Sequence, residues 1–228
     1  MAVILKNVVP FGRSFDEYRH MFNLTSADLA GNILGVGDGP ASFNAEGTQQ
    51  GYSITSVDPV YVFSGSEIKS RFDAVVDNII HQVKATPTDW VWTYHQSPDQ
   101  LRMNRIKALT HFLQDYDSGK AAHRYVIGEL PQLPFATRQF SLALCSHLLF
   151  LYSEQFDQAF HLQSIQEMLR VAPEVRIFPL LTLQLQRSPY LDQIQQTLSE
   201  LGYAVSVQTV GYELQKGGNE MLVIKDCK

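Results

Sequence analysis

Residues 32–47, NILGVGDGPASFNAEG, pass from a short apolar run through three closely spaced glycines into an amphipathic segment. The apolar run predicts a buried β-strand, and the segment from about Ala41 to Gln50 predicts a helix that Gly51 ends. A second β-rich run, YSITSV, follows at residues 52–57. The stretch therefore predicts a β-α-β unit in which a glycine turn joins the carboxyl end of a strand to the amino end of a helix.

The rest of the chain continues this alternation of strands and helices. Capping boxes at 14–17 and 64–67 predict two helix starts, and SPDQ at 97–100 predicts a third helix that runs to about Tyr116. The second half adds predicted strands and helices, namely strands at 123–128, 140–146 and 174–180, helices at 154–171 and 188–202, and a final hairpin that turns at 216–219. This order predicts a doubly wound, seven-stranded mixed α/β sheet with an N-terminal helix and a C-terminal antiparallel hairpin.

Composition limits the function classes. The chain has 228 residues, 45% of them hydrophobic, and a net charge of −5 without a basic block, which argues against nucleic-acid partners. No stretch has the length of a membrane span, and the start is too poor in apolar residues for a signal peptide, so we expect a cytoplasmic protein. Cys145 and Cys227 lack partners at zinc-ligand spacing, so we expect free thiols and no metal site.

Ligands of such sheets bind beyond the carboxyl ends of the strands, where the strand order reverses. Gly37 and Gly39 allow a tight turn and close backbone approach to a nucleotide-like ligand. Asp58, which ends the second strand, can accept hydrogen bonds from ribose hydroxyls. A pyrophosphate would meet Asp38, and residues 32–58 contain no Lys or Arg, so the loop favours a cationic ligand such as S-adenosylmethionine (SAM) over a dinucleotide.

The series ILGVGDGPASF, VDP, YVIGELPQLPFATRQFSLALCSHLLFLY and EMLRV, in this order, resembles the motifs of class I (Rossmann-like) SAM-dependent methyltransferases over residues 30–228. The resemblance implies one SAM-binding domain, 1–228, with a helical cover at 1–30 and a helical insertion at 61–124. Two positions depart from the pattern, because the family usually has an acidic residue at Gly35 and a glycine at Ala41. Asp38 is the candidate to take over part of the missing acidic role.

The resemblance also implies roles for individual residues. The reaction side would be formed by residues 145–147, where His147 is the candidate base and Ser146 and Tyr152 form a polar rim for an acceptor. The implied cofactor-binding residues, including an aromatic wall from the first helix, are Tyr18, Val36, Gly37, Asp38, Gly39, Asp58, Pro59, Glu129, Leu130 and Cys145.

Each of these residues also has a purely structural interpretation. The glycines can form a plain strand-to-helix turn, Asp58 can cap the next turn, Glu129 can be a solvated turn residue, and Cys145 can be a small core residue. His147 can be a hydrogen-bonded structural histidine, and for His161, inside an amphipathic helix, that is the favoured interpretation. The same holds for a group of aromatic residues that can line a sulfonium pocket or fill the core, namely Tyr18, Phe22, Phe150 and Tyr152.

We therefore expect an enzyme that transfers the SAM methyl group to a small-molecule acceptor by in-line displacement. The absence of an NPPY-type motif after the fourth strand argues against a nucleic-acid base as the acceptor. Three alternatives stay open: a nicotinamide-dependent oxidoreductase, an enzyme that attacks the methionine chain of SAM and releases methylthioadenosine, and a non-catalytic SAM-binding protein. We expect neither nucleic acid nor membrane as a partner, and the sequence leaves the oligomeric state open.

Overall fold

The computed structural model describes residue 5 and residues 8–227, which form one seven-stranded mixed sheet in the order β3-β2-β1-β4-β5-β7-β6. Strands β1 to β5 are parallel, and β7 runs antiparallel to both β5 and β6. This arrangement confirms the predicted Rossmann-like methyltransferase fold. The strands are β1 (Asn32–Val36), β2 (Ser53–Val57), β3 (Tyr125–Val126), β4 (Leu142–Ser146), β5 (Glu174–Phe178), β6 (Tyr203–Thr209) and β7 (Glu220–Asp226).

The helices begin where the sequence places caps. Ser14 and Ser64 each form a capping box, in which the serine hydroxyl and the glutamate three residues later satisfy free backbone N–H groups. The helices are α1 (Phe15–Met21), α2 (Ser26–Leu29), α3 (Phe43–Gln49), α4 (Gly65–Ala85), α5 (Pro98–Ala121), α6 (Gln158–Val171) and α7 (Leu191–Glu200), with short 3-10 helices η1 (Pro59–Val62) and η2 (Pro87–Asp89).

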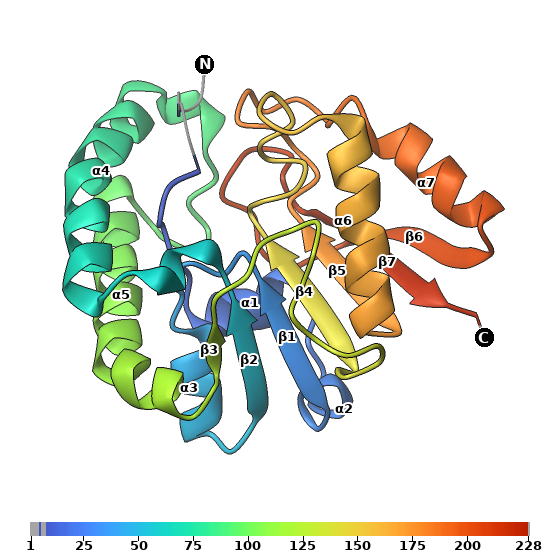
Figure 1. Ribbon diagram of the computed structural model, residues 1–228. Helices are drawn as coiled ribbons and strands as arrows, with labels where there is room; N and C mark the ends of the chain where they lie inside the picture. Colours follow the sequence, from blue (N-terminus) through green and yellow to red (C-terminus); the bar gives the residue numbers. More distant parts are fainter. Residues whose placement is uncertain (1–4, 6–7, 228) are drawn as a thin grey trace.

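The helices cover the two faces of the sheet in two groups. Alternate residues of β1 show this: Ile33 packs into a core with α1, α3, α4 and α5, whereas Leu34 packs into a second core with α6 and α7. In Figure 1, α4 and α5 flank the sheet on the left, and α6 and α7 cover its right half. Because the central strand β4 is buried on both faces, it is apolar along nearly its whole length.

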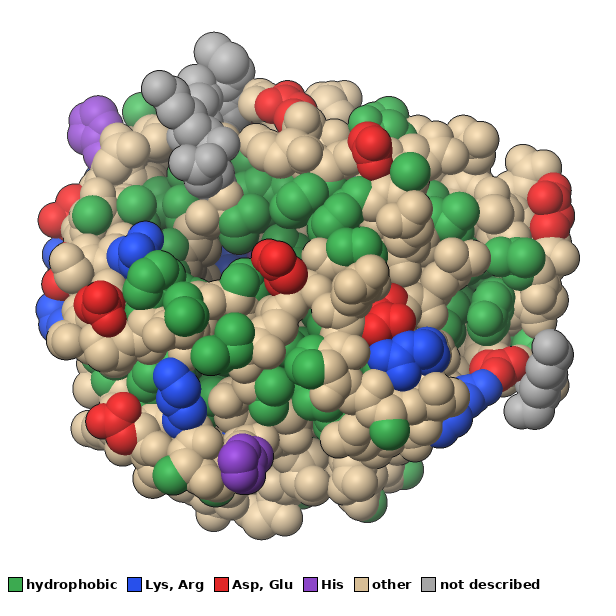
Figure 2. All heavy atoms as spheres, in the orientation of Figure 1, with side chains coloured by type: hydrophobic (Ala, Val, Ile, Leu, Met, Phe, Trp, Pro, Cys, Tyr) green, Lys and Arg blue, Asp and Glu red, His purple; other side chains and the backbone are tan. Residues whose placement is uncertain are grey.

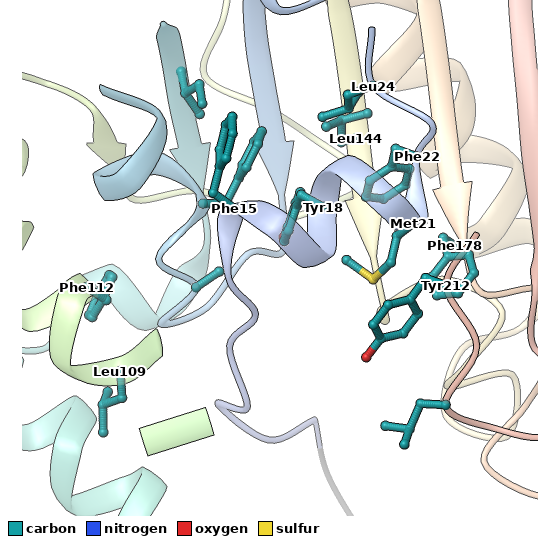
Figure 3. Close-up of a cluster of buried hydrophobic side chains, with 14 of the residues drawn as sticks. Phe15, Tyr18, Met21, Phe22, Leu24, Leu109, Phe112, Leu144, Phe178 and Tyr212 are labelled. Carbon is teal, nitrogen blue, oxygen red and sulfur yellow. The ribbon is translucent and has the colours of Figure 1, made fainter. Parts of the chain in front are cut away.

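Helix α1 is part of the first core. Its apolar stripe, which includes Tyr18, Met21 and Phe22, is almost fully buried. Figure 3 shows these side chains projecting from α1; the ring of Phe22 lies 6.3 Å from that of Phe178, and Phe178 lies 5.9 Å from Tyr212. The helix therefore joins the sheet to the segment between β6 and β7 as well as to α3.

Several predicted boundaries are wrong, and one of them is the start of α6, which is at Gln158 instead of residue 154. Strand β3 has only two residues, and α5 extends to Ala121. The predicted turn at 216–219 is part of a longer connection, because Thr209 pairs with Glu220 and residues 210–219 leave the hairpin. This connection buries Tyr212 and Leu214, and Leu214 accepts a backbone hydrogen bond of 2.8 Å from Val91. Burial of these two side chains explains why the chain leaves the hairpin, and the turn at residues 215–218, closed by a 2.7 Å bond from the Gly218 amide to the Gln215 carbonyl, lies within the connection.

Residues 1–4, 6–7 and 228, which belong to the predicted domain 1–228 and in part to the predicted cover 1–30, lie outside the described residues. Residues 59–121, between β2 and β3, contain η1, α4, η2 and α5, and α4 packs against α5. Within the described part of the chain, no helix has both the length and the apolar character that crossing a bilayer requires.

Candidate functional site

A cleft of about 530 Å³ lies at the carboxyl ends of β1, β2 and β4, where the strand order reverses between β1 and β4. Its walls are the glycine loop at 37–39, residues 58–60 after β2, residues 146–148 after β4 and the segment 8–13 before α1. Figure 2 shows hydrophobic side chains gathered over the upper, hollowed half of this face. The cleft therefore brings together the segments that the sequence predicts for a cofactor site.

The glycine loop needs its glycines. Gly37 has a φ of 68° and Gly39 a φ of 52°, values that favour glycine. A side chain on Gly37 would also collide with Leu148 from the loop after β4. The Gly37 amide donates a 2.9 Å hydrogen bond to the carbonyl of Val57, which ties the loop to the end of β2. Residues 37–39 therefore pack closely against neighbouring segments and form the floor of the cleft.

Asp38 lies buried beneath this loop. Its carboxylate accepts hydrogen bonds of 2.6 Å from the hydroxyls of both Tyr18 and Ser56. Burial raises the pKa of Asp38 to about 7, with a contribution from the charge of Asp58, although the two hydroxyl donors act in the opposite direction. A cation bound in the cleft would favour the ionised carboxylate.

Asp58 holds the turn after β2 and faces the same cleft. One carboxylate oxygen accepts a 2.8 Å hydrogen bond from the amide of Gly39, and the other accepts one of 2.8 Å from the amide of Val60. Burial raises the pKa of Asp58 to about 6 despite these donors. The structural interpretation of Asp58 as a cap is therefore correct. Each oxygen has a second lone pair, so a role toward a ribose is compatible with it.

A neighbouring cleft of about 460 Å³ continues from Asp58 toward β3. Six of the predicted cofactor residues line it, namely Val36, Gly37, Asp58, Pro59, Glu129 and Leu130. The Glu129 side chain is exposed, whereas Leu130 is buried. This cleft is mainly apolar and adjoins a carboxylate, which suits a flat ring attached to a sugar.

Cys145 differs from the other predicted cofactor residues. Its side chain is fully buried in the core between the sheet and α6, and the residues that line the two clefts do not include it. Burial raises the pKa of its thiol to about 12. Cys145 and Cys227 are both free thiols, as expected.

Ser146 and His147 reach the cleft from the end of β4. His147 has a φ of 54°, which is unusual for a residue with a side chain, and its Nδ1 lies 2.9 Å from the Ser146 hydroxyl. Burial lowers the pKa of His147 well below its ordinary value, and the charges of Arg13 and Arg105 lower it further. The imidazole is therefore neutral at pH 7 and can accept a proton.

Tyr152 is buried away from the glycine loop, in a smaller cavity behind His147, and its hydroxyl accepts a 3.4 Å hydrogen bond from the amide of Val9. Phe22 and Phe150 are fully buried core residues. His161 is structural: its Nε2 accepts a 3.1 Å bond from the amide of Phe150, and its Nδ1 lies 2.7 Å from the carbonyl of Asp157.

Two arginines that sequence reasoning missed also line the main cleft. Arg71 of α4 stacks at 3.8 Å on the ring of Phe63, and Arg13 comes from the segment before α1. The absence of basic residues from 32–58 therefore does not extend to the whole cleft. Arg13 precedes the Ser14 cap, and its carbonyl accepts a 3.0 Å bond from the amide of Ser42, which fixes it beside α3.

A buried ion pair lies next to Arg13. Arg105 of α5 donates a 2.7 Å hydrogen bond to Glu17, and the hydroxyl of Tyr212 donates one of 2.9 Å to the same carboxylate. Burial raises the pKa of Glu17, but the charge of Arg105 and the bonds from His95 and Arg105 outweigh burial and hold the pKa well below its ordinary value. In the sequence, only the charges of Glu17 and Arg105 at otherwise apolar helical positions indicate this pair.

Comparisons with known proteins place the chain as follows. No family model matches it. It is 34% identical over 222 residues to the uncharacterized protein MJ0045 of Methanocaldococcus jannaschii, an alignment that covers 97% of each chain. Among solved structures, it is similar to a SAM-dependent methyltransferase from Aquifex aeolicus, with a TM-score of 0.45, 11% identity and coverage of 92% of this chain and 88% of that one.

Magnesium protoporphyrin IX methyltransferase from Synechocystis PCC 6803, solved with bound SAM, gives a TM-score of 0.44, 11% identity and coverage of 93% of this chain and 90% of that one. These structural similarities are too distant to carry an argument about activity.

Proposed function

The chain belongs to the same family as protein MJ0045, and we propose that it is a SAM-dependent methyltransferase that acts on a small molecule. The observation that carries this proposal is the position of two carboxylates, the buried Asp38 within the glycine loop and the half-buried Asp58 bonded to it, at the reversal point of the sheet. An anionic pyrophosphate in the loop would lie against Asp38, whereas a sulfonium would be attracted to it.

The clefts offer a separate place for each part of SAM. The adenine ring would lie in the cleft lined by Glu129 and Leu130, with the ribose at Asp58. The methionine part would then extend over the glycine loop toward Asp38 and Tyr18. Bound SAM supplies an electrophilic methyl group, so the protein has only to position an acceptor in line with it and exclude water.

His147 is our candidate for the general base, with Ser146 as its positioning partner. The neutral imidazole lines both the main cleft and the cavity behind it, where an acceptor could meet the methyl group. Tyr152 lies in the same cavity and completes its polar rim. Cys145 would contribute only through its backbone, since its side chain points into the core.

The test is incubation of the purified protein with SAM, followed by identification of the fragments by mass spectrometry. We expect S-adenosylhomocysteine to form once an extract of small metabolites is added, and neither fragment to form without it. Steady release of methylthioadenosine from SAM alone would instead assign the enzyme to attack on the methionine chain. Binding of NAD without binding of S-adenosylhomocysteine would contradict the proposal entirely.

A further inference from the structure

Behind the main cleft lies a second cavity of about 90 Å³, which we call the inner chamber. Most of its wall is apolar and comes from α4, α5, the segment after β5 and the 210–219 connection. Trp90, Phe178 and Tyr212 are among its aromatic residues. Because one water needs roughly 10–15 Å³ by this kind of measure, the chamber has room for a small organic molecule.

The inner chamber adjoins the main cleft directly. Val9, Phe11, Arg13 and His147 line both cavities and so form the wall between them. A molecule in the chamber would therefore contact His147 from one side, while a ligand over the glycine loop would contact it from the other. This is the relation that an acceptor and a methyl donor require.

Arg13 gives the chamber a polar anchor. Its Nη1 donates a hydrogen bond to the carbonyl of Phe11, but its buried Nε has no hydrogen-bond partner among the described residues. A buried donor without a partner costs free energy, which a ligand that accepts its hydrogen bond would recover. A guanidinium with a free N–H fits a carboxylate best.

The charges around Arg13 also favour an anion. Arg13 and Arg105 are both cationic, and Glu17 balances only one of them. His95 and His147 are neutral, because burial lowers the pKa of each. Among the described groups that act on Arg13, one positive charge thus remains without compensation in a poorly hydrated place.

Arg13 lines both cavities, and its charge acts on groups of both: it lowers the pKa values of His147 and Tyr152, and also that of Tyr18 in the main cleft. The two linings differ in their acidic residues. Asp38 and Asp58 line the main cleft, whereas the described residues that line the chamber include no Asp or Glu. An anion would therefore meet no acidic side chain on the chamber side of Arg13.

We propose that the inner chamber binds the methyl acceptor, and that this acceptor is a small, largely apolar monocarboxylate whose carboxylate pairs with Arg13. The inference rests on the proposed function, because it takes the main cleft as the SAM site. The carboxylate serves as a binding group, and the aromatic wall holds the apolar part of the molecule so that a separate hydroxyl faces His147. The oxygen of this hydroxyl would take the methyl group as the bond between that group and the sulfonium breaks, its proton would pass to His147, and S-adenosylhomocysteine would leave.

The experiment measures binding of three probe acids, benzoate, phenylacetate and hexanoate, to the full chain saturated with S-adenosylhomocysteine. We expect at least one acid to bind tenfold or more tightly than its neutral amide. Arg13→Gln should abolish this preference. Arg19→Gln, which removes the same charge from an exposed position of α1, should leave it unchanged.

A second measurement tests whether Arg13 pairs with the carboxylate of the acceptor or with that of the cofactor. S-adenosylhomocysteine carries a carboxylate, whereas methylthioadenosine does not. Arg13→Gln should leave the affinity for both unchanged; a tenfold loss for S-adenosylhomocysteine alone would show that Arg13 holds the cofactor, and would overturn the inference. If the wild-type chain does not bind S-adenosylhomocysteine, the proposed function fails, whereas binding of the cofactor product without any preference for acids refutes only the acceptor class.

The wild-type comparison of acids with amides does not depend on the folding of any variant. A further wild-type measurement follows the His147 imidazole by NMR. Because the charge of Arg13 lowers the pKa of His147, an acid paired with Arg13 should raise that pKa, and the amide should not. An unchanged imidazole titration in the presence of a bound acid would place the acid elsewhere and contradict the inference.

Discussion

The carboxylate of Asp38 fills the space that a side chain on Gly35 would occupy. A Cβ added to Gly35 would collide with all three atoms of that carboxyl group, which the hydroxyls of Tyr18 and Ser56 hold in place. The class I methyltransferase pattern has an acid at the position of Gly35, and in this chain the acid of the loop fills the space next to that position. The position of the Asp38 carboxylate therefore requires a residue without a side chain at position 35.

A first prediction follows from this requirement. Gly35→Ala should displace Asp38, break its two hydrogen bonds and weaken S-adenosylhomocysteine binding at least tenfold, since each bond to a charged group contributes on the order of 1.5–3 kcal/mol. The double variant Gly35→Asp/Asp38→Gly returns a carboxylate to the region and should recover part of the affinity. Calorimetry checks both, and a double variant weaker than Gly35→Ala would argue against the exchange.

Comparison with Asp38→Asn should show that the stability and the cofactor affinity of the wild-type chain change in opposite directions with pH. Asp38 has a folded-state pKa of about 7, above the ordinary value of 3.8. The unfolded chain therefore releases this proton first, and the free energy of unfolding falls as pH rises from about 4 to 7. Relative to Asp38→Asn, the wild-type chain should lose about 2 kcal/mol between pH 5 and pH 7.

The measurement is urea unfolding of both proteins across this pH range. Binding should change in the opposite direction: the wild-type affinity for SAM should fall below pH 7, where Asp38 becomes protonated, and the affinity of Asp38→Asn should be low and vary less with pH. Parallel stability profiles for the two proteins would mean that Asp38 is not a buried carboxyl group that titrates near neutral pH.

Asp58→Ala tests the ribose contact. It should lower S-adenosylhomocysteine affinity at least tenfold, because charge-assisted hydrogen bonds are lost. It should also destabilise the chain, since the amides of Gly39 and Val60 lose their acceptors. Asp58→Asn is the matched control that keeps size and one acceptor oxygen. A variant that loses stability but binds normally would show that Asp58 only supports the turn.

His147→Ala tests the candidate base. Once an acceptor is identified, the variant should form S-adenosylhomocysteine at least 10²-fold more slowly while binding it with unchanged affinity. The rate of the wild-type enzyme should not fall between pH 8 and pH 7, because the lowered pKa of His147 keeps the imidazole neutral there. Equal rates for variant and wild type would assign His147 a structural role.

Glu17→Gln should be strongly destabilising. It leaves Arg105 as an uncompensated buried charge, and breaking such a pair typically costs about 3–5 kcal/mol. Asp16→Asn, an exposed neighbour on the same helix, is the control and should change stability by less than about 1 kcal/mol. Thermal unfolding compares the two, and similar midpoints would argue against a buried ion pair.

The order of strands and helices could be predicted because local signals and tertiary structure agree. The Ser14 and Ser64 caps begin helices as predicted, and the apolar run at β4 is a central strand. The 210–219 connection could not be predicted in this way. Its course depends on Tyr212 and Leu214 packing against distant parts of the chain, and no short-range pattern records such contacts.

The same limit applies to the candidate site. Gly37, Asp38 and Asp58 follow strands directly, so topology alone brings them to one edge. Arg13 reaches the cleft because its backbone is bound beside α3, and Ser56 holds Asp38 from the next-to-last position of β2. The sequence of α1 predicts Tyr18 as part of an aromatic wall, but it does not indicate that Glu17 is buried as well.

The connection between β6 and β7 lines the inner chamber but neither of the two clefts beside the glycine loop. Residues from 32–60 and 128–148 line the main cleft and the cleft beside it. Tyr212, Leu214, Gln215 and Gly218 line only the inner chamber. On the proposed function, mutations in this late loop should change which acceptor binds without disturbing the SAM site. Exchange of residues 210–219 between relatives would accordingly alter acceptor choice independently of the donor.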